Sequence, residues 1–236
     1  MRILHTNDFH GTLDDAKQAV LAGFRKDADL YFDCGDCIKA GNLALPMRPE
    51  PVWPRLADLH CTASVIGNRE SHPLEAAFRA KIEGAKHPLL CGNMHRRSNG
   101  EEVLPRSMLL EVGGFKVGVL AVMVPMVTSR VATRLASQFL WDEPITTAIK
   151  LAGELRDHVD CLIALTHIGF RKDVELASKC PELDLILGGH SHTLLKEPEM
   201  VGRVAICQTG SHGRFCGIYD WRADSGLSSY ELKSLA

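Results

Sequence analysis

Seven side chains of the kinds that bind transition metals occur at five places along this 236-residue sequence. They are Asp8 with His10, Asp36, Asn68, His167, and His190 with His192. Each place follows a short apolar run, which is where a buried strand would deliver side chains to one rim of a sheet. Carboxylate, carboxamide and imidazole groups gathered at one rim can hold metal ions that activate water. The pattern therefore predicts a metal centre that performs hydrolysis.

The spacing inside two of these groups favours shared coordination. Asp8 and His10 are two residues apart, and so are His190 and His192. In an extended segment alternate side chains point the same way, so each pair can bind one ion. With Asp36 as a bridge, the seven side chains divide into two four-ligand clusters. Mixed imidazole and carboxylate ligands favour manganese, iron or zinc over magnesium or calcium, and manganese is our first expectation.

The sequence also contains a C-x-x-C pair, Cys34 and Cys37, on either side of Asp36. Such a pair could be redox-active or form half of a zinc site. Neither a second C-x-x-C nor a paired histidine completes a zinc site, and no helical pattern opens at Cys34. We therefore interpret both thiols as small core residues.

Strand-like and helix-like runs alternate along most of the chain, which is typical of a layered α/β architecture. Strands are predicted at 2–6, 30–33, 63–66, 89–91, 161–165, 183–187, 204–208, 215–221 and 229–233. Helices are predicted at 13–26, 73–85 and 145–159, with Pro73 in a first turn. Gly113 and Gly114 separate two further strands, 108–112 and 115–122, and form a hairpin signal. The proline-rich stretch 46–54 is expected to be a loop that could act as a lid.

Composition excludes several classes of partner. Charged residues make up 24% of the chain and the net charge is −2, so it carries no nucleic-acid footprint. No run approaches the roughly 20 apolar residues of a membrane span, and no secretory signal is visible. Eight cysteines without an export signal favour reduced thiols and a cytoplasmic location. We expect one domain over 1–236, and the sequence predicts no oligomeric state.

Five motifs in order resemble those of the calcineurin-like metallophosphoesterase superfamily, and within it the branch that includes 5′-nucleotidases. They are Thr6-Asn7-Asp8-Phe9-His10-Gly11, Gly35-Asp36, Gly67-Asn68, Thr166-His167 and Gly188-Gly189-His190-Ser191-His192. The resemblance implies one metal held by Asp8, His10, Asp36 and His192. It implies a second metal held by Asp36, Asn68, His167 and His190. The implied fold is α/β, a four-layer α-β-β-α sandwich of two mixed sheets with the metal site at the C-terminal rim of the strands.

The implied chemistry is hydrolysis of a small-molecule phosphoester or phosphoanhydride. In such centres two ions roughly 3.5–4 Å apart polarise the phosphoryl oxygens and generate a bridging hydroxide that attacks phosphorus in line. The seven ligands hold the ions in place, and Asn68 also belongs to the catalytic set.

The third motif departs from the family pattern. Many members have Gly-Asn-His, whose histidine protonates the leaving group or stabilises the transferring phosphoryl group, but this chain has Arg69 there. Arginine has a pKa above about 12 and cannot act as a general acid, although its guanidinium can clamp a phosphate. We therefore expect phosphodiesters with good leaving groups, or diphosphate linkages, to be favoured unless His72 or His212 supplies the proton. UDP-2,3-diacylglucosamine diphosphatases resemble this chain in having Gly-Asn-Arg.

Substrate contacts are predicted from Arg69, from His95 and His212, and from the loops 38–54, 92–104 and 209–215. The 5′-nucleotidase branch has a C-terminal domain that stacks the nucleobase between aromatic side chains. This chain ends at Ala236 and has 14 aromatic residues, so we do not expect nucleotide specificity. The alternatives are a 5′-nucleotidase-like phosphomonoesterase and a non-catalytic metal-binding scaffold. A redox protein using the C-x-x-C pair is a further alternative.

Overall fold

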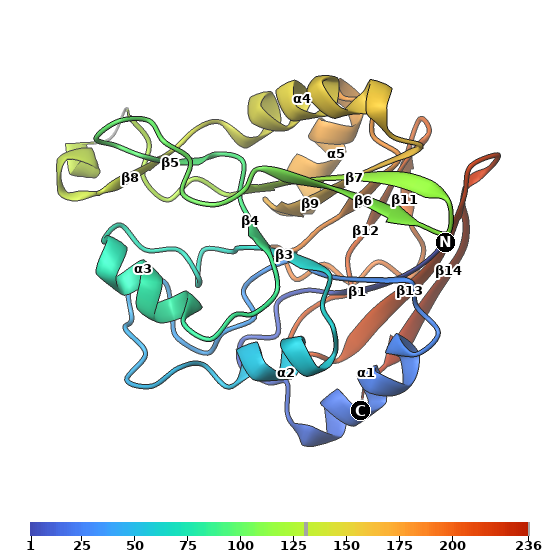
Figure 1. Cartoon of the computed structure of the whole chain (residues 1–236), viewed down its shortest axis with the longest axis horizontal. Coiled ribbons are helices and arrows are strands. Elements are labelled where there is room, and N and C mark those ends of the chain that lie inside the picture. The colour runs from blue at the N-terminus through green and yellow to red at the C-terminus, as the bar shows by residue number, and fades with distance from the viewer. Residues whose placement is uncertain (130–131, 236) are drawn as a thin grey trace.

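Two six-stranded mixed sheets face each other at the centre of the structure, a computed structural model that describes residues 1–129 and 132–235 (Figure 1). The first sheet has the strand order β14 (Gly226–Ser234), β13 (Phe215–Arg222), β1 (Arg2–Thr6), β2 (Leu30–Asp33), β3 (Ala63–Val65) and β4 (Leu89–Leu90). The second has the order β11 (Glu199–Val201), β12 (Val204–Cys207), β10 (Leu185–Leu187), β9 (Cys161–His167), β7 (Phe115–Met123) and β6 (Ser107–Val112).

The middle of each sheet is parallel. Strands β1 to β4 pair in parallel, and so do β7, β9, β10 and β12, whereas β6, β11, β13 and β14 pair antiparallel at the edges. Because parallel strands all end at the same edge, the loops that leave β1, β2, β3, β9 and β10 are gathered at one rim of the molecule.

Side chains alternate between the two faces of each strand, and this alternation builds the layers. Ile3 and Phe32 point into a shared core with Val119 and Ile163 of the second sheet. Leu4 lies on the opposite, outer face of the first sheet. The predicted four-layer α-β-β-α sandwich is confirmed, because helices cover both outer faces.

The outer helices cover the sheets through apolar faces. On the second sheet lie α4 (Pro144–Leu155) and α5 (Phe170–Lys179), whose Leu151 and Leu176 are fully buried. On the first sheet lie α1 (Asp15–Arg25) and α2 (Val52–Asp58). Asp14 caps α1 by accepting the amide of Lys17 at 2.9 Å. Two short 3₁₀ turns, η1 (Ala132–Ala136) and η2 (Arg156–His158), complete the helical elements.

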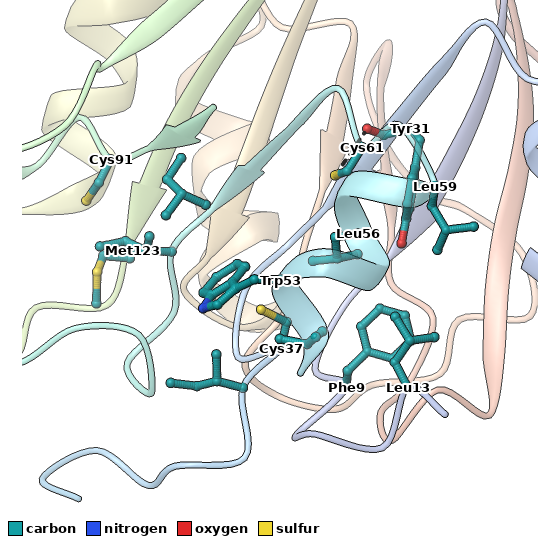
Figure 2. Packing of buried hydrophobic residues seen from close by; sticks show 14 of the residues in the cluster. Phe9, Leu13, Tyr31, Cys37, Trp53, Leu56, Leu59, Cys61, Cys91 and Met123 are labelled. Atoms are coloured by element: carbon teal, nitrogen blue, oxygen red, sulfur yellow. Dashed lines mark hydrogen bonds between the residues drawn. The ribbon is translucent and has the colours of Figure 1, made fainter. Parts of the chain in front are cut away.

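The expectation of an irregular loop over 46–54 is wrong at its C-terminal end, because α2 begins at Val52. Pro51 is the N-cap and Pro54 lies in the first turn, where a helix needs no donor from proline. Figure 2 shows Trp53 and Leu56 of this helix in the outer core, with Cys37 beside them. The helix therefore forms despite the nearby prolines, because its apolar residues pack into the core.

Other predicted boundaries shift as well. Helix α3 (Glu75–Ile82) is shorter than 73–85, because Leu74 is an extended N-cap, so Pro73 lies outside the first turn. The predicted loop 92–104 contains β5 (Met94–Arg96), which pairs antiparallel with β8 (Phe139–Trp141) in a small separate sheet. The hairpin prediction is confirmed, with positive φ at both Gly113 and Gly114.

The C-x-x-C pair is divided between two cores. Cys34 is buried between the sheets, and Cys37 is buried in the outer cluster that Figure 2 shows. All eight cysteines are buried free thiols, and burial raises the pKa of both Cys34 and Cys37. This confirms the core interpretation of the pair. Within 1–129 and 132–235, no helix has the length and apolarity needed to cross a bilayer.

Candidate metal centre

Strand exits bring the predicted ligands to one rim. Asp8, Asp36, Asn68 and His190 follow the ends of β1, β2, β3 and β10 by two or three residues, and His167 is the last residue of β9. Each of these strands is buried, so its exit turn is held in a fixed place.

Five of the seven predicted ligands adopt a left-handed backbone conformation. Asp8, His10, Asp36, His190 and His192 have φ between 51° and 77°. The expectation that alternate positions of an extended segment deliver each Asp-x-His or His-x-His pair is therefore wrong. Tight turns deliver these side chains instead. Non-glycine residues at positive φ are uncommon and cluster at functional sites, where the surrounding packing enforces them.

The ligand atoms form two groups that share Asp8. Asp8, His10 and His192 bring one donor atom each within 4.8 Å of one another, and Asp8, Asp36 and His167 do the same. The remaining two ligands join them, because Asn68 Oδ1 lies 2.9 Å from His190 Nδ1 and 3.2 Å from His167 Nε2. The bridging position predicted for Asp36 stays a prediction.

Polar atoms in the first group lack ordinary partners. Asp8 Oδ1 is buried without a hydrogen bond, yet it lies 3.6 Å from His10 Nε2 and 3.3 Å from His192 Nε2. The two imidazole Nε2 atoms lie only 2.8 Å apart. A cation between these three atoms would satisfy all of them, so the residues present fit a metal ion.

The charge in the second group also favours a cation. Burial alone would lower the pKa of His167, but the Asp36 carboxylate at 3.4 Å outweighs it and raises the pKa to about 10. Burial conversely opposes ionisation of Asp36, and His167 nevertheless holds the pKa of that carboxyl well below its usual range. The pair binds a proton strongly at the place where a metal ion would carry the charge.

Glycines leave the room that these groups need. A Cβ on Gly67 would lie 2.2 Å from Asp36 Oδ1, and a Cβ on Gly189 would lie 3.0 Å from Asp8 Oδ2. A side chain at Gly67 would displace the Asp36 carboxylate, and one at Gly189 would clash with the Cys34 carbonyl at 2.6 Å and crowd Asp8.

Several supporting residues escaped the sequence reasoning. The Asn7 carboxamide donates to Asp8 Oδ2 at 2.8 Å and to the Gly210 carbonyl at 2.7 Å, and it accepts from the Thr209 amide. It thereby fixes Asp8 against the 209–215 loop. Its place inside the first motif was the available signal.

A second support lies behind the His190 turn. Asp173 of α5 is fully buried, and it accepts from Thr166 Oγ1 at 2.6 Å and from Gln208 Nε2 at 2.9 Å. Burial raises the pKa of Asp173 to about 7. Gln208 in turn accepts from Ser191 Oγ at 3.0 Å, beside the two histidine ligands. A lone acidic residue on a helix gave no sequence signal for this network.

The predicted catalytic residues differ in how close they come to the ligands. The Arg69 amide donates to Asp36 Oδ1 at 2.8 Å, and its partly exposed guanidinium donates to the Lys39 carbonyl at 3.0 Å. His212 is exposed, its ring lies 4.9 Å from that of His10, and its amide donates to the Asp8 carbonyl at 2.7 Å. Both residues therefore stand at the centre.

The other two predicted histidines are occupied elsewhere. His72 is 8% exposed, and its Nδ1 accepts the Leu74 amide at 3.0 Å. Burial lowers the pKa of His72, and Lys81 adds to the effect. His95 lies on β5, and its Nδ1 faces Asp142 at 3.4 Å. Within residues 1–129 and 132–235, neither ring forms a hydrogen bond or ion pair with a predicted ligand.

Comparison with known proteins places the chain among phosphoesterases. The sequence profile of calcineurin-like phosphoesterases matches residues 1–194. The trifunctional nucleotide phosphoesterase protein YfkN of Bacillus subtilis is 27% identical over 93% of this chain and 18% of its own length. A 5′-nucleotidase of Vibrio cholerae is 24% identical over 99% of this chain and 49% of its own length.

The fold is shared with a solved structure. The crystal structure of the calcineurin-like phosphoesterase YfkN from Bacillus subtilis aligns with a TM-score of 0.78 at 20% identity, covering 100% of this chain and 90% of that one. Although it covers most of that solved structure, the chain spans only about half the length, or less, of the curated relatives it matches.

Proposed function

The chain belongs to the calcineurin-like phosphoesterase family, and we propose that it hydrolyses small-molecule phosphoesters at a centre of two divalent metal ions. The observation that carries this proposal is the meeting of all seven predicted ligands at one rim. Asp8, His10, Asp36 and His192 would hold one ion. Asp36, Asn68, His167 and His190 would hold the other.

When bound, such ions polarise the phosphoryl oxygens and lower the pKa of the attacking water. The chain's own residues hold the ligands at fixed positions, as Asn7 does for Asp8 and the Arg69 amide does for Asp36. We propose manganese first, with iron or zinc as alternatives, because oxygen and imidazole donors meet here without a thiolate.

Arg69 and His212 are the proposed substrate contacts. The Arg69 guanidinium stands beside Asp36 with its side chain 29% exposed, so it can reach an anion bound at the centre. His212 stands beside His10, where its ring can contact the phosphoryl group or the leaving group. We prefer His212 to His72 for the acid role, because the exposed His212 ring lies beside the ligand His10, whereas His72 is buried. A contact from His95 stays a prediction.

The loop 38–54 is a further proposed determinant of the substrate. Asn42 accepts a hydrogen bond from Asn68 Nδ2 at 2.9 Å, so this loop reaches the ligands. Beyond that contact, Leu43, Leu45 and Met47 are exposed. We propose that the loop contacts the organic part of the substrate, and that its tip tolerates apolar groups there.

Because Arg69 stands where many family members have histidine, we propose a preference for phosphodiesters with good leaving groups or for diphosphates. Purified protein with Mn should be assayed on an aryl phosphodiester, an alkyl phosphomonoester and a nucleoside diphosphate conjugate. The diester or the diphosphate should have the highest kcat/KM, since their leaving groups need little protonation. An alkyl monoester as the best substrate would refute the preference, though not the hydrolase.

The variant Arg69→His tests the same point from the protein side. It should improve the ratio of monoester to diester hydrolysis by about tenfold, because an imidazole can donate the proton that an alkoxide requires. Arg69→Lys is the matched control, since it keeps the charge and its ammonium group, with a pKa of about 10.4, is a much weaker acid than an imidazolium. Equal ratios in the two variants would remove the leaving-group argument.

A 5′-nucleotidase-like phosphomonoesterase is the second candidate, because a 24% identical relative is named a 5′-nucleotidase. The substrate panel above separates it from the first. A non-catalytic scaffold is disfavoured by the intact ligand set. Turnover that disappears on chelation and returns with Mn would exclude it.

We also propose that the protein works in the cytoplasm. All eight cysteines are free thiols, which is the state that a reducing compartment maintains. Cell fractionation tests this proposal.

A further inference from the structure

One buried carboxylate beneath the centre, Glu70, belongs to neither predicted ligand set. Its residue is 1% exposed, and it lies two positions after Asn68. The two oxygens of Glu70 accept four backbone amides, at 2.8, 2.8, 3.1 and 2.8 Å, which belong to Asp36, Cys37, Ile38 and Gly67. Hydrogen bonds to an ionised acceptor are the strong kind, and leaving their donors unpaired in a buried place is costly.

The pattern of these bonds joins two separate turns. Glu70 Oε2 accepts from Asp36 and from Gly67, so one oxygen links the turn after β2 to the turn after β3. The two turns also touch directly, since a Cβ on Gly35 would lie 2.6 Å from the Gly67 nitrogen. They present two ligands, Asp36 and Asn68. The separation of these ligands therefore depends on Glu70.

A second contact fixes the same pair from the other side. The Arg69 amide donates to Asp36 Oδ1 at 2.8 Å. Two neighbouring residues of the turn after β3 therefore hydrogen-bond to Asp36. Glu70 accepts from its backbone amide, and the Arg69 amide donates to its carboxylate. A shift of either turn would move the carboxylate away from Asn68.

We propose that Glu70 is a positioning residue that sets the distance between Asp36 and Asn68, and thereby the affinity of the centre for the metal ion that Asp36, Asn68, His167 and His190 would hold. The inference rests on the proposed two-metal function. The role is specific to the ligands held by these two turns, and His10 and His192 depend on it less.

The chain contains a matched control. Glu50 is 6% exposed and accepts the amides of Lys39 and Ala40 at 3.1 and 2.9 Å. It performs the same kind of task as Glu70, on the next two amides of the same segment. Those amides are three and four residues beyond Asp36, so Glu50 holds the loop without holding a ligand.

The test compares Glu70→Gln with Glu50→Gln, because each change replaces an accepting oxygen by a donating amide of similar shape. Metal-free wild type and variants are titrated with Mn by calorimetry, and bound metal is counted by elemental analysis. Urea unfolding without metal gives the stability of each protein. We expect Glu70→Gln to bind the Mn ion at Asp36 and Asn68 at least tenfold more weakly. We expect Glu50→Gln to bind both ions within about threefold of wild type. Excess Mn should restore part of the Glu70→Gln activity.

The outcomes separate the possible failures. Wild type that binds fewer than two ions refutes the two-metal function itself. Wild type that binds two, with both variants weakened equally in proportion to their lost stability, overturns the positioning role alone. If Glu70→Gln does not fold, Glu70→Asp replaces it, since a shorter carboxylate keeps the charge but cannot reach both turns. Failure of both variants to fold would assign Glu70 to folding and would also overturn the inference.

Discussion

The two halves of the centre differ in how firmly they are built. The inner half, Asp36 with Asn68, His167 and His190, has its Asp36 and His167 side chains 4% and 0% exposed. In the outer half, His10 with His192, the His10 side chain is also buried at 5% exposed, but that of His192 is 42% exposed.

Ring orientation shows the same difference. His167 Nδ1 bonds the Cys34 carbonyl at 2.7 Å, which fixes the ring and leaves Nε2 for coordination. His10 Nδ1 is buried without a hydrogen-bond partner in the described structure. The inner half is thus preorganised by the strands, whereas the outer half has freedom to adjust. A metal ion in the outer half should exchange more readily than one in the inner half.

The largest expected effect comes from breaking the inner half. Asp36→Asn should lower kcat/KM by about 10³-fold or more and reduce bound Mn, because it removes a buried charge that pairs with His167. His192→Asn should lower it by about 10- to 100-fold, and added Mn should restore much of the loss. Kinetics at several Mn concentrations, with metal content, measure both. If both variants lost kcat/KM equally and added Mn restored neither, the two halves would not differ in how firmly they are built.

The free energy of unfolding is expected to depend on pH through His5, a histidine next to the centre that is not a predicted ligand. His5 is fully buried beneath the centre, where burial lowers its pKa from 6.5 to about 3, although Asp8 opposes the shift. The unfolded chain therefore binds more protons between these pH values, and stability falls as pH drops below 6.5.

The expected slope from this residue is about 1.4 kcal/mol per pH unit, or about 3 kcal/mol between pH 6.5 and 4.5. Urea unfolding of metal-free protein should show a smaller acid loss in His5→Gln than in wild type. His212→Gln should change the slope less than His5→Gln does, because His212 is exposed, although burial also lowers its pKa. A slope that His5→Gln does not alter would contradict the prediction.

The smallest effect is expected at the edge of the outer half. His212→Asn should lower kcat/KM by about tenfold while bound Mn stays at the wild-type level, because His212 is proposed to contact substrate rather than metal. Steady-state kinetics with metal analysis checks this. Loss of Mn in the variant would instead make His212 part of the metal site.

Much of the fold was predictable because its signals are local. The short apolar run Ile3-Leu4 and the Gly113-Gly114 turn indicate a buried strand and a hairpin from neighbouring residues alone. The start of α2 was missed because the burial of Trp53 against other segments decided it. The small sheet of β5 and β8 was missed because its strands are short and more than 40 residues apart.

The sequence by itself determined which chemical groups this protein can bring to a metal, since ligand type and motif order are properties of the chain. It also determined the strand ends that carry them. Only the tertiary structure decided that left-handed turns present Asp8 and His190, that Asp8 stands between both groups, and that Glu70 joins two turns from below. The reason is physical: these features depend on distances between segments far apart in the chain, and packing alone sets those distances.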